Sequence, residues 1–265
     1  MIKTCSQLVY LLAVYDRKLE RIMTITTKIM DIVKDKMVIM KHSETESICI
    51  VGPVKLPVKQ GDFSETFQWY NWLKVDANLS KEEIIDSLAT ANLAFQQQSS
   101  VLVYGDFANG EDAIIRMHSI CHTGDIFGSQ RCDCGYQLHE SMKMIAEHGC
   151  GAIFYLADHE GRGIGLFSKS VAYLLQEEGL DTVEANHALG FPDDTRSYED
   201  AMTVLEALRT KPVTLITNNP KKLEALEAHG LAAEGHVPLW GGITETNQFY
   251  LNTKVEKSGH MRESK

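Results

Sequence analysis

The chain of 265 residues has no apolar run approaching the roughly 20 residues that a membrane-spanning helix needs. Its most apolar early piece, Leu8 to Val14, is short, and Asp16, Arg17 and Lys18 follow directly. This piece also lacks a convincing small-residue cleavage site, so it does not read as a signal peptide. We therefore expect a cytoplasmic protein with no membrane partner.

Basic residues are in deficit, with 26 Lys and Arg against 36 Asp and Glu, for a net charge of −10. A general nucleic-acid binder usually carries a basic face, so we expect no nucleic-acid partner. An anionic small substrate would need a local basic pocket. Six cysteines are present, and without a secretory signal we expect them to be buried thiols, metal ligands or nucleophiles rather than disulfides.

No repeat or low-complexity tract divides the chain, but its first part differs from the rest. Residues 1–47 are rich in methionine and β-branched side chains and show no active-site pattern, which predicts an N-terminal extension of unknown role. Strand and helix patterns alternate from residue 48 onward. They predict a mixed α/β catalytic domain over residues 48–261, with residues 262–265 as a C-terminal tail.

Apolar periodicity and capping signals locate individual elements in this domain. Strands are predicted at 48–51 (ended by Gly52-Pro53), 101–104, 113–117, 151–156 and 213–217. Helices are predicted near 81–97, 136–148, 166–178 and 198–209, and another begins at Pro220. Ser80 with Glu83 forms a capping-box pattern before the first of these helices.

Three of the six cysteines lie within fourteen residues: Cys121, Cys132 and Cys134. Three thiolates can occupy three corners of a zinc tetrahedron and leave the fourth for water, as in a catalytic zinc site. Zinc lowers the pKa of bound water to about 7. Two other interpretations stay open on spacing alone: a metal-free set of loop and core cysteines, and a structural zinc with His118 or His122 as fourth ligand.

The surrounding segment, residues 116–135, resembles the zinc segment of the GTP cyclohydrolase II family. Further motifs follow in that family's order: HEGRGIGL (159–166), DTVEANHALGF (181–191), LITNNPKK (215–222) and LNTKVEKSGHM (251–261). KLPVKQGDF (55–63) resembles its opening strand. The resemblance implies a GTP cyclohydrolase II-like fold in which helices flank a mixed sheet.

The resemblance also implies an activity, the first step of riboflavin biosynthesis. The family opens the imidazole ring of GTP and releases formate and pyrophosphate, giving 2,5-diamino-6-(5-phosphoribosylamino)pyrimidin-4(3H)-one. One zinc ion per chain supplies the attacking water, and magnesium assists the triphosphate. A homodimer is also implied.

Residue roles follow by matching motifs. Asp194 is implied to be the proton acceptor, Arg196 the group proposed to attack the α-phosphate, and Tyr173 a tyrosine implicated in catalysis. A phosphate clamp is the simpler physical role for Arg196, because a guanidinium stays protonated. Without the resemblance, Asp194 and Arg196 read as an ion pair at a helix N-terminus, and Tyr173 as a core residue.

The remaining matched positions are implied to contact the nucleotide. They are Arg116, Met117, His118, Ser119, Gln137, Glu160, Gly161, Arg162, Thr182, Thr217 and Lys222.

Three features depart from the family pattern: Ile120 stands where the family usually has Glu, residues 75–98 resemble an insertion, and residues 1–47 form an arm. They leave an alternative open, a paralogue that acts on a different purine or pyrimidine nucleotide or base in another pathway. A third possibility is a non-catalytic nucleotide-binding or regulatory protein that keeps zinc for structure. The intact Asp194, Arg196 and Tyr173 argue against it.

Overall fold

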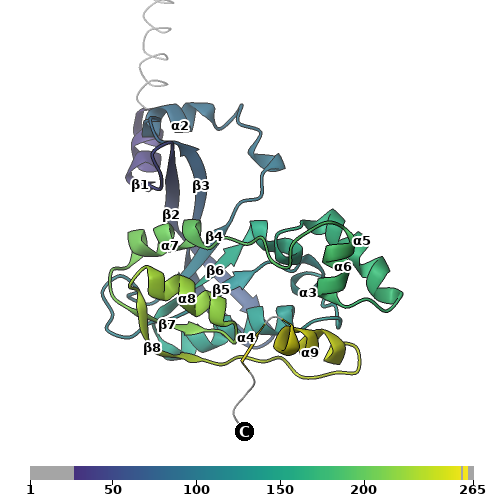
Figure 1. The fold of residues 1–265 in the computed structure, drawn as a ribbon. Helices are drawn as coiled ribbons and strands as arrows, with labels where there is room; N and C mark the ends of the chain where they lie inside the picture. Colours follow the sequence, from purple (N-terminus) through teal and green to yellow (C-terminus); the bar gives the residue numbers. More distant parts are fainter. Residues whose placement is uncertain (1–26, 258, 262–265) are drawn as a thin grey trace, which may run out of the picture.

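The computed structural model describes residues 27–257 and 259–261, which form one mixed sheet with helices on both faces (Figure 1). The strand order is β1-β2-β3-β4-β6-β5-β7-β8. Strands β1 (Met37–Lys41), β2 (Glu46–Gln60), β3 (Phe63–Asp76), β4 (Ser100–Tyr104) and β6 (Gly151–Leu156) pair antiparallel in that order. The mixed sheet with flanking helices confirms the predicted fold class.

The other half of the sheet is parallel. Strand β5 (Ile114–Ser119) lies between β6 and β7 (Val213–Ile216), and β8 (Ala232–Val237) pairs with β7 at the edge. Parallel strands need crossover connections, and helices supply them. The carboxyl ends of β5, β6 and β7 therefore meet at one edge of the sheet.

Alternate side chains of the strands enter two different cores, as the period of two in a strand requires. One core packs Ile115 and Phe154 against α7 (Glu199–Leu208) and α8 (Pro220–Ala228). The other packs Ile114 and Ile153 against Met142 and Ile145 of α4 (Cys134–His148). The central strands are thus covered on both faces, which explains their nearly continuous apolar sequences.

The first part of the described chain belongs to the same sheet. Residues 27–35 are helical, and β1 pairs along β2 from Met37↔Val51 to Lys41↔Ser47. The boundary expected at residue 48 therefore falls inside β2. The part of the expected extension before residue 27, and the tail at 262–265, lie outside the described residues.

The strand predicted to stop at Gly52-Pro53 continues instead. The pairing between β2 and β3 shifts register between Val51 and Val54 and then resumes to the hairpin at Gln60↔Phe63. A proline can be accommodated here because the shift leaves it outside the regular ladder.

The helix predicted near 81–97 is wrong in length. Helix α2 covers Lys81–Ser87, with the predicted capping box between Ser80 and Glu83, and a short 3-10 helix, η1, covers Leu93–Phe95. Asn92 between them has a left-handed φ of 50°, which a continuous α-helix does not allow. Of the apolar residues that suggested one long helix, Ile84 is buried but Leu88 and Phe95 are exposed.

Most other predicted elements agree with the structure within two residues. Helix α4 ends at Gly149, which adopts a φ of 87°, and α8 begins at Pro220 as predicted. Helices α3 (His122–Asp125), α5 (Leu166–Glu177), α6 (Thr182–Ala188) and α9 (Gln248–Glu256) gather beyond the carboxyl ends of the parallel strands, with the 3-10 segment η2 (Ala157–Arg162) (Figure 1). Among the described residues, no helix combines the length and apolarity needed to cross a membrane.

Candidate functional site

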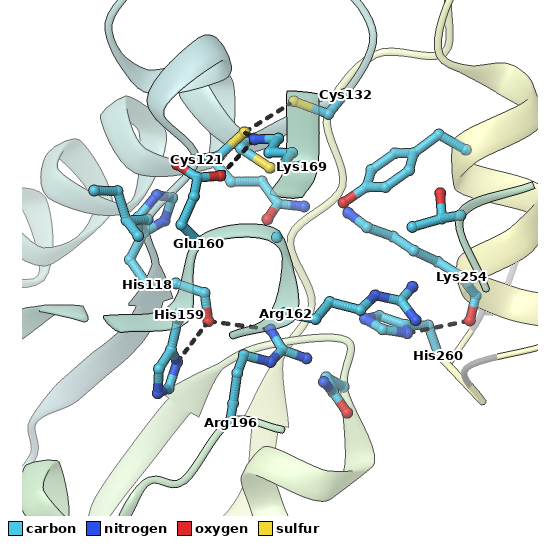
Figure 2. A pocket seen from close by; sticks show the side chains of 18 of the residues that line it. His118, Cys121, Cys132, His159, Glu160, Arg162, Lys169, Arg196, Lys254 and His260 are labelled. Atoms are coloured by element: carbon cyan, nitrogen blue, oxygen red, sulfur yellow. Dashed lines mark hydrogen bonds and ion pairs between the residues drawn. The ribbon is translucent and has the colours of Figure 1, made fainter. Parts of the chain in front are cut away.

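A cavity opens where the parallel strands end, the usual place for a ligand in an α/β sheet. The chain leaves β5 at Ser119 toward Cys121, leaves β6 into η2, and leaves β7 toward Asn218 and Asn219. All of these exits line the cavity, which has a volume of about 1160 Å³ including its open mouth. Figure 2 shows the side chains that face it.

The three predicted metal ligands meet on one wall of this cavity. The sulfur atoms of Cys121, Cys132 and Cys134 all lie within 4.8 Å of one another, and those of Cys121 and Cys132 are 3.6 Å apart. Zn–S bonds of about 2.3 Å in a tetrahedral site place sulfurs roughly 3.8 Å apart. The spacing of the three thiols therefore fits the ligands of a single zinc ion.

Gly124 lets the two cysteine segments approach each other. A Cβ atom on Gly124 would lie 2.9 Å from Cys132 Sγ and 3.2 Å from Cys121 Sγ. In the described part of the chain, neither His118 nor His122 joins the cysteine cluster. The structure thus brings three protein ligands together rather than four.

A buried lysine and a buried glutamate stand beside Cys121. Lys169 Nζ lies 3.2 Å from Cys121 Sγ and 2.6 Å from Glu160 Oε1 (Figure 2). Glu160 Oε2 accepts a hydrogen bond from the backbone N–H of His122 at 2.7 Å. Hydrogen bonds from Cys132 and Cys134, together with the Lys169 charge, hold the pKa of the Cys121 thiol far below its usual range. Hydrogen bonds to Cys121 and burial raise the pKa values of Cys132 and Cys134, so without a metal the negative charge of the cluster is held on Cys121.

His118 is held by a second buried carboxylate. Asp125 accepts hydrogen bonds from His118 Nε2 (3.1 Å), the Cys121 backbone N–H (2.9 Å) and Tyr155 Oη (3.0 Å). Burial lowers the pKa of His118 despite this partner. His118 lines the cavity, and its Nδ1 is buried without a hydrogen-bond partner among the described residues.

Asp194 and Arg196 form a two-pronged ion pair just before α7. Arg196 Nε lies 2.8 Å from Asp194 Oδ1 and its Nη2 lies 2.5 Å from Oδ2. Burial opposes ionisation of Asp194, but Arg196 outweighs it and lowers the pKa of that carboxyl. Arg196 lines the cavity, whereas Asp194 stands behind it and fixes its orientation.

A directed chain of hydrogen bonds continues from Arg196. Its Nη1 donates to Ser119 Oγ at 3.1 Å, and Ser119 lies 3.1 Å from His159 Nδ1 (Figure 2). His159 Nε2 lies 2.8 Å from the Ser197 carbonyl, which can only accept. Nε2 therefore carries the proton, and Nδ1 accepts from Ser119. Burial lowers the pKa of His159 to about 4, consistent with a neutral ring.

Three basic side chains, those of Arg116, Arg196 and Lys222, form the cationic end of the cavity. Arg116 hydrogen-bonds the side chain of Gln137 and donates to the Ile216 carbonyl at 3.0 Å. Lys222 Nζ donates to the Met117 carbonyl at 2.7 Å. Burial and the nearby charges of Arg116 and Arg196 hold the pKa of Lys222 well below its usual value. An incoming anion would relieve this repulsion.

The glycine-rich turn bends sharply beside the cavity. Gly161 and Arg162 both have left-handed φ values, 62° and 67°. Gly163 follows at 92°, and a Cβ atom there would meet Thr195 Oγ1 at 2.1 Å. The Arg162 carbonyl accepts the Thr195 backbone N–H at 3.1 Å. The turn is thus locked to the segment that carries Asp194 and Arg196.

The cavity gathers all but two of the residues that were matched as site residues. Thr182, Thr217 and Tyr173 line it, and Tyr173 lies beneath the Arg131 guanidinium at 4.2 Å from the ring centre. The two exceptions are Asp194 and Met117. Met117 is 1% exposed and packs in the apolar core. Ile120 also lines the cavity.

Several lining residues had no predicted role. They are Arg131, His159, Lys169, Asn186, Trp240, Tyr250, Lys254 and His260, among others. Some lie in quoted motifs, such as the segments 159–166 and 251–261, which could have indicated them.

Comparisons with known proteins agree with this geometry. The family model described as GTP cyclohydrolase II matches residues 85–238. A Bacillus cereus riboflavin biosynthesis protein RibBA is 46% identical over 175 residues, which is 66% of this chain and 44% of the relative.

Plant relatives are similar as well. The Arabidopsis thaliana bifunctional riboflavin biosynthesis protein RIBA 1, chloroplastic, is 51% identical over 160 residues, covering 60% of this chain and 30% of the relative. The Arabidopsis thaliana monofunctional riboflavin biosynthesis protein RIBA 3, chloroplastic, is 48% identical over 164 residues, covering 62% and 32%. The matches thus span less than half the length of these relatives. Since the family model covers more than half of this chain, the chain belongs to the GTP cyclohydrolase II family.

Proposed function

We propose that this chain is a zinc-dependent GTP cyclohydrolase II that opens the imidazole ring of GTP and releases formate and pyrophosphate. The product would be 2,5-diamino-6-(5-phosphoribosylamino)pyrimidin-4(3H)-one, in the first step of riboflavin biosynthesis. One observation carries the proposal: three thiols within 4.8 Å of one another share a cavity with Arg116, Arg196 and Lys222. A hydrolytic metal and an anion-binding end would thereby share one cavity.

Cys121, Cys132 and Cys134 would hold one zinc ion per chain. When bound, zinc acts as a Lewis acid that makes water nucleophilic near neutral pH. Lys169 would balance the negative charge of the thiolates, and Glu160 would keep Lys169 beside Cys121, at 2.6 Å from its ammonium group. Both oxygens of Glu160 are engaged by the protein, so we assign its side chain to shaping the site.

The cationic end would bind the triphosphate, with magnesium accompanying it. The pKa of Arg196 is raised above its already high value, because the hydrogen bonds and charge of Asp194 outweigh the effect of burial. A guanidinium held in this state is an electrostatic clamp for phosphate rather than a nucleophile. Asp194 would keep the guanidinium group of Arg196 oriented toward the cavity. Arg162, Thr217 and the backbone before α8 would add further contacts to the anion.

Protons near the reacting ring would be handled by the side chains around the cysteines. His118 lines the cavity and has an unpartnered Nδ1 among the described residues, and the Tyr173 hydroxyl lies 3.5 Å from Thr123 Oγ1. Desolvation raises the pKa of Tyr173, so its hydroxyl stays protonated at neutral pH and can donate a hydrogen bond. Asp194, locked to Arg196, is less suited to accept a proton.

Ile120 favours a second candidate, a paralogue that acts on a different purine or pyrimidine nucleotide. It places an apolar side chain in the cavity wall next to Cys121, where a carboxylate is usual in the family. Such a change leaves the metal ligands and the cationic end intact. It would alter which base is accepted rather than the type of reaction.

We further propose a homodimer in the cytoplasm, with residues 48–261 as the catalytic part and no nucleic-acid partner. The net charge of −10 supports the last point. Residues 27–47 would support the sheet rather than the chemistry, since β1 pairs with β2 and none of these residues lines the cavity.

The experiment that tests the function offers zinc-loaded protein a panel of nucleotides with magnesium. The panel contains GTP, ATP, ITP and CTP, and formate and ring-opened product are both quantified. Formate release from GTP above the other nucleotides supports the first candidate. Turnover of another nucleotide but not GTP would favour the second, and no product from any nucleotide would contradict both.

A further inference from the structure

The C-terminal segment, residues 244–257 and 259–261, forms a wall of the cavity although it lies beyond the family-model match at 85–238. Tyr250, Lys254 and His260 line the cavity from this segment. Figure 2 shows Lys254 and His260 on the yellow C-terminal ribbon, across the view from Cys121 and Glu160. The segment therefore belongs to the site in space.

Both ends of this segment are attached to parts of the chain that flank the cavity. Thr246 Oγ1 donates to the Gln130 carbonyl at 2.8 Å, just before Cys132. Met261 N–H donates to the Asn218 carbonyl at 2.9 Å, just after β7. Between these anchors, helix α9 directs Lys254 toward the segment that carries two of the three cysteines.

Lys254 reaches Asp133, the residue between Cys132 and Cys134. Its Nζ lies 2.8 Å from Asp133 Oδ1, and the Asp133 side chain is 1% exposed. Asp133 stands at the N-cap of α4, where an aspartate normally accepts from the helix backbone, but its side chain makes no capping bond. The carboxylate is turned toward α9 instead.

The second oxygen of Asp133 completes a rigid junction. It accepts from Gln137 Nε2 at 2.5 Å and from the Gly241 backbone N–H at 3.3 Å. A Cβ atom on Gly241 would lie 2.5 Å from Asp133 Cβ, so only glycine permits this close approach. Two segments distant in sequence, at Gly241 and Lys254, thus converge with Gln137 on the residue between the two proposed metal ligands.

We propose that Lys254 is a positioning residue for the metal site: by pairing with Asp133 it holds the Cys132–Cys134 turn in the geometry that binds zinc. This inference rests on the zinc site of the proposed function. Without Lys254, a buried carboxylate would lose its counter-charge and draw water or rearrange, moving both cysteines. Groups that orient metal ligands in this way typically change metal affinity by about 10- to 100-fold.

The direction in which zinc affinity changes when Lys254 is replaced distinguishes a positioning role from simple charge repulsion. An ammonium group near a dication repels it, so removing the charge alone would strengthen zinc binding. Loss of a positioning contact weakens it. The two explanations therefore predict opposite changes in the same measurement.

The test compares zinc dissociation constants, by competition with a chromophoric chelator, for wild type, Lys254→Met, Lys254→Arg and Lys257→Met. Lys257 is a matched control on the same segment, because its exposed side chain pairs with Asp181 and Glu184 instead. We expect Lys254→Met to bind zinc at least about 10-fold more weakly. Lys254→Arg should recover most of the affinity, and Lys257→Met should match wild type.

Unchanged or tighter zinc binding by folded Lys254→Met would overturn the inference while leaving the zinc site itself intact. Wild type that binds no zinc would overturn both the inference and the proposed metal. If Lys254→Met fails to fold, Gly241→Ala provides the second variant, since its new methyl displaces Asp133 without removing a charge. Wild-type affinity in Gly241→Ala would then reject the role of the Asp133 junction.

Discussion

At the scale of single residues, the three clustered cysteines differ in their surroundings from Cys49 and Cys150, the other cysteines in the described part of the chain. Cys121, Cys132 and Cys134 converge within 4.8 Å, whereas Cys150 Sγ lies 3.5 Å from the Asp106 carbonyl, outside the cluster. Spacing in the sequence favoured the first group as ligands. Only the convergence of their sulfur atoms separates three ligands from a looser set of loop cysteines.

Replacing Cys132 with Ser should abolish stable zinc binding, because a serine hydroxyl is a poor substitute for a thiolate ligand. Elemental analysis after dialysis should find about one zinc per chain in wild type and nearly none in Cys132→Ser. Cys150→Ser is the control and should retain wild-type zinc. Equal zinc content in Cys132→Ser and wild type would count against the proposed ligand set.

The protonation of His159 makes the stability of the folded chain depend on pH. Its folded-state pKa is about 4, below the ordinary value of 6.5, because burial disfavours the charged ring. Between these values the unfolded chain binds a proton that the folded chain does not, so stability falls as pH drops from about 6.5 toward 4. The contribution to the free energy of unfolding is on the order of 3 kcal/mol.

Replacing His159 with Gln should remove part of this acid sensitivity, because an amide does not titrate and can still bond both neighbours. Urea unfolding at pH 7 and pH 5 provides the measurement. The loss of stability between the two pH values should be smaller in His159→Gln than in wild type. An identical loss in both proteins would show that other groups carry the effect.

At the scale of elements, the end of α7 is fastened to the loop before β5 by one buried arginine. Arg209 is 2% exposed and donates to the carbonyl oxygens of Phe107 (2.6 Å), Gly110 (2.9 Å) and Glu111 (3.1 Å). These bonds fix the segment that leads into β5, the strand that ends at the cysteine site.

Arg209→Met should lower the free energy of unfolding by about 3 kcal/mol or more, since several buried carbonyls lose their donor. Lys211→Met is the control: Lys211 pairs with Glu111 at the surface, and its loss should cost less than about 1 kcal/mol. Chemical denaturation of both variants gives the comparison. A smaller loss for Arg209→Met than for Lys211→Met would refute this role.

The elements also show which parts of the fold could be read from the sequence. Buried parallel strands such as β6 and helices with clear stop signals such as α4 were predicted within two residues. Helix α9 was not, because its buried residues include Thr253 and Lys254, so no apolar period marks it. Strand β3 was missed because only two of its residues are buried and the apolar pairs Trp69-Tyr70 and Trp72-Leu73 interrupt the alternation of its sequence.

At the scale of the whole molecule, the site depends on contacts between distant parts of the chain. Lys254 and Asp133 are 121 residues apart, and Arg116 meets the Ile216 carbonyl across 100 residues. Local sequence patterns carry no information on such pairs. The ordered motifs indicated most of the cavity, yet the roles of Lys169 and Lys254 required the structure, because a lysine on a helix ordinarily reads as a solvated charge.

The central claim is that one cavity combines a three-cysteine zinc site with a triphosphate-binding end and removes C8 of GTP. The most direct measurement incubates zinc-loaded protein with magnesium and GTP labelled at C8, and follows labelled formate together with pyrophosphate. We predict that both are released, that release stops when zinc is chelated, and that restoring zinc restores it. GTP left intact by protein that carries one zinc per chain would contradict the account.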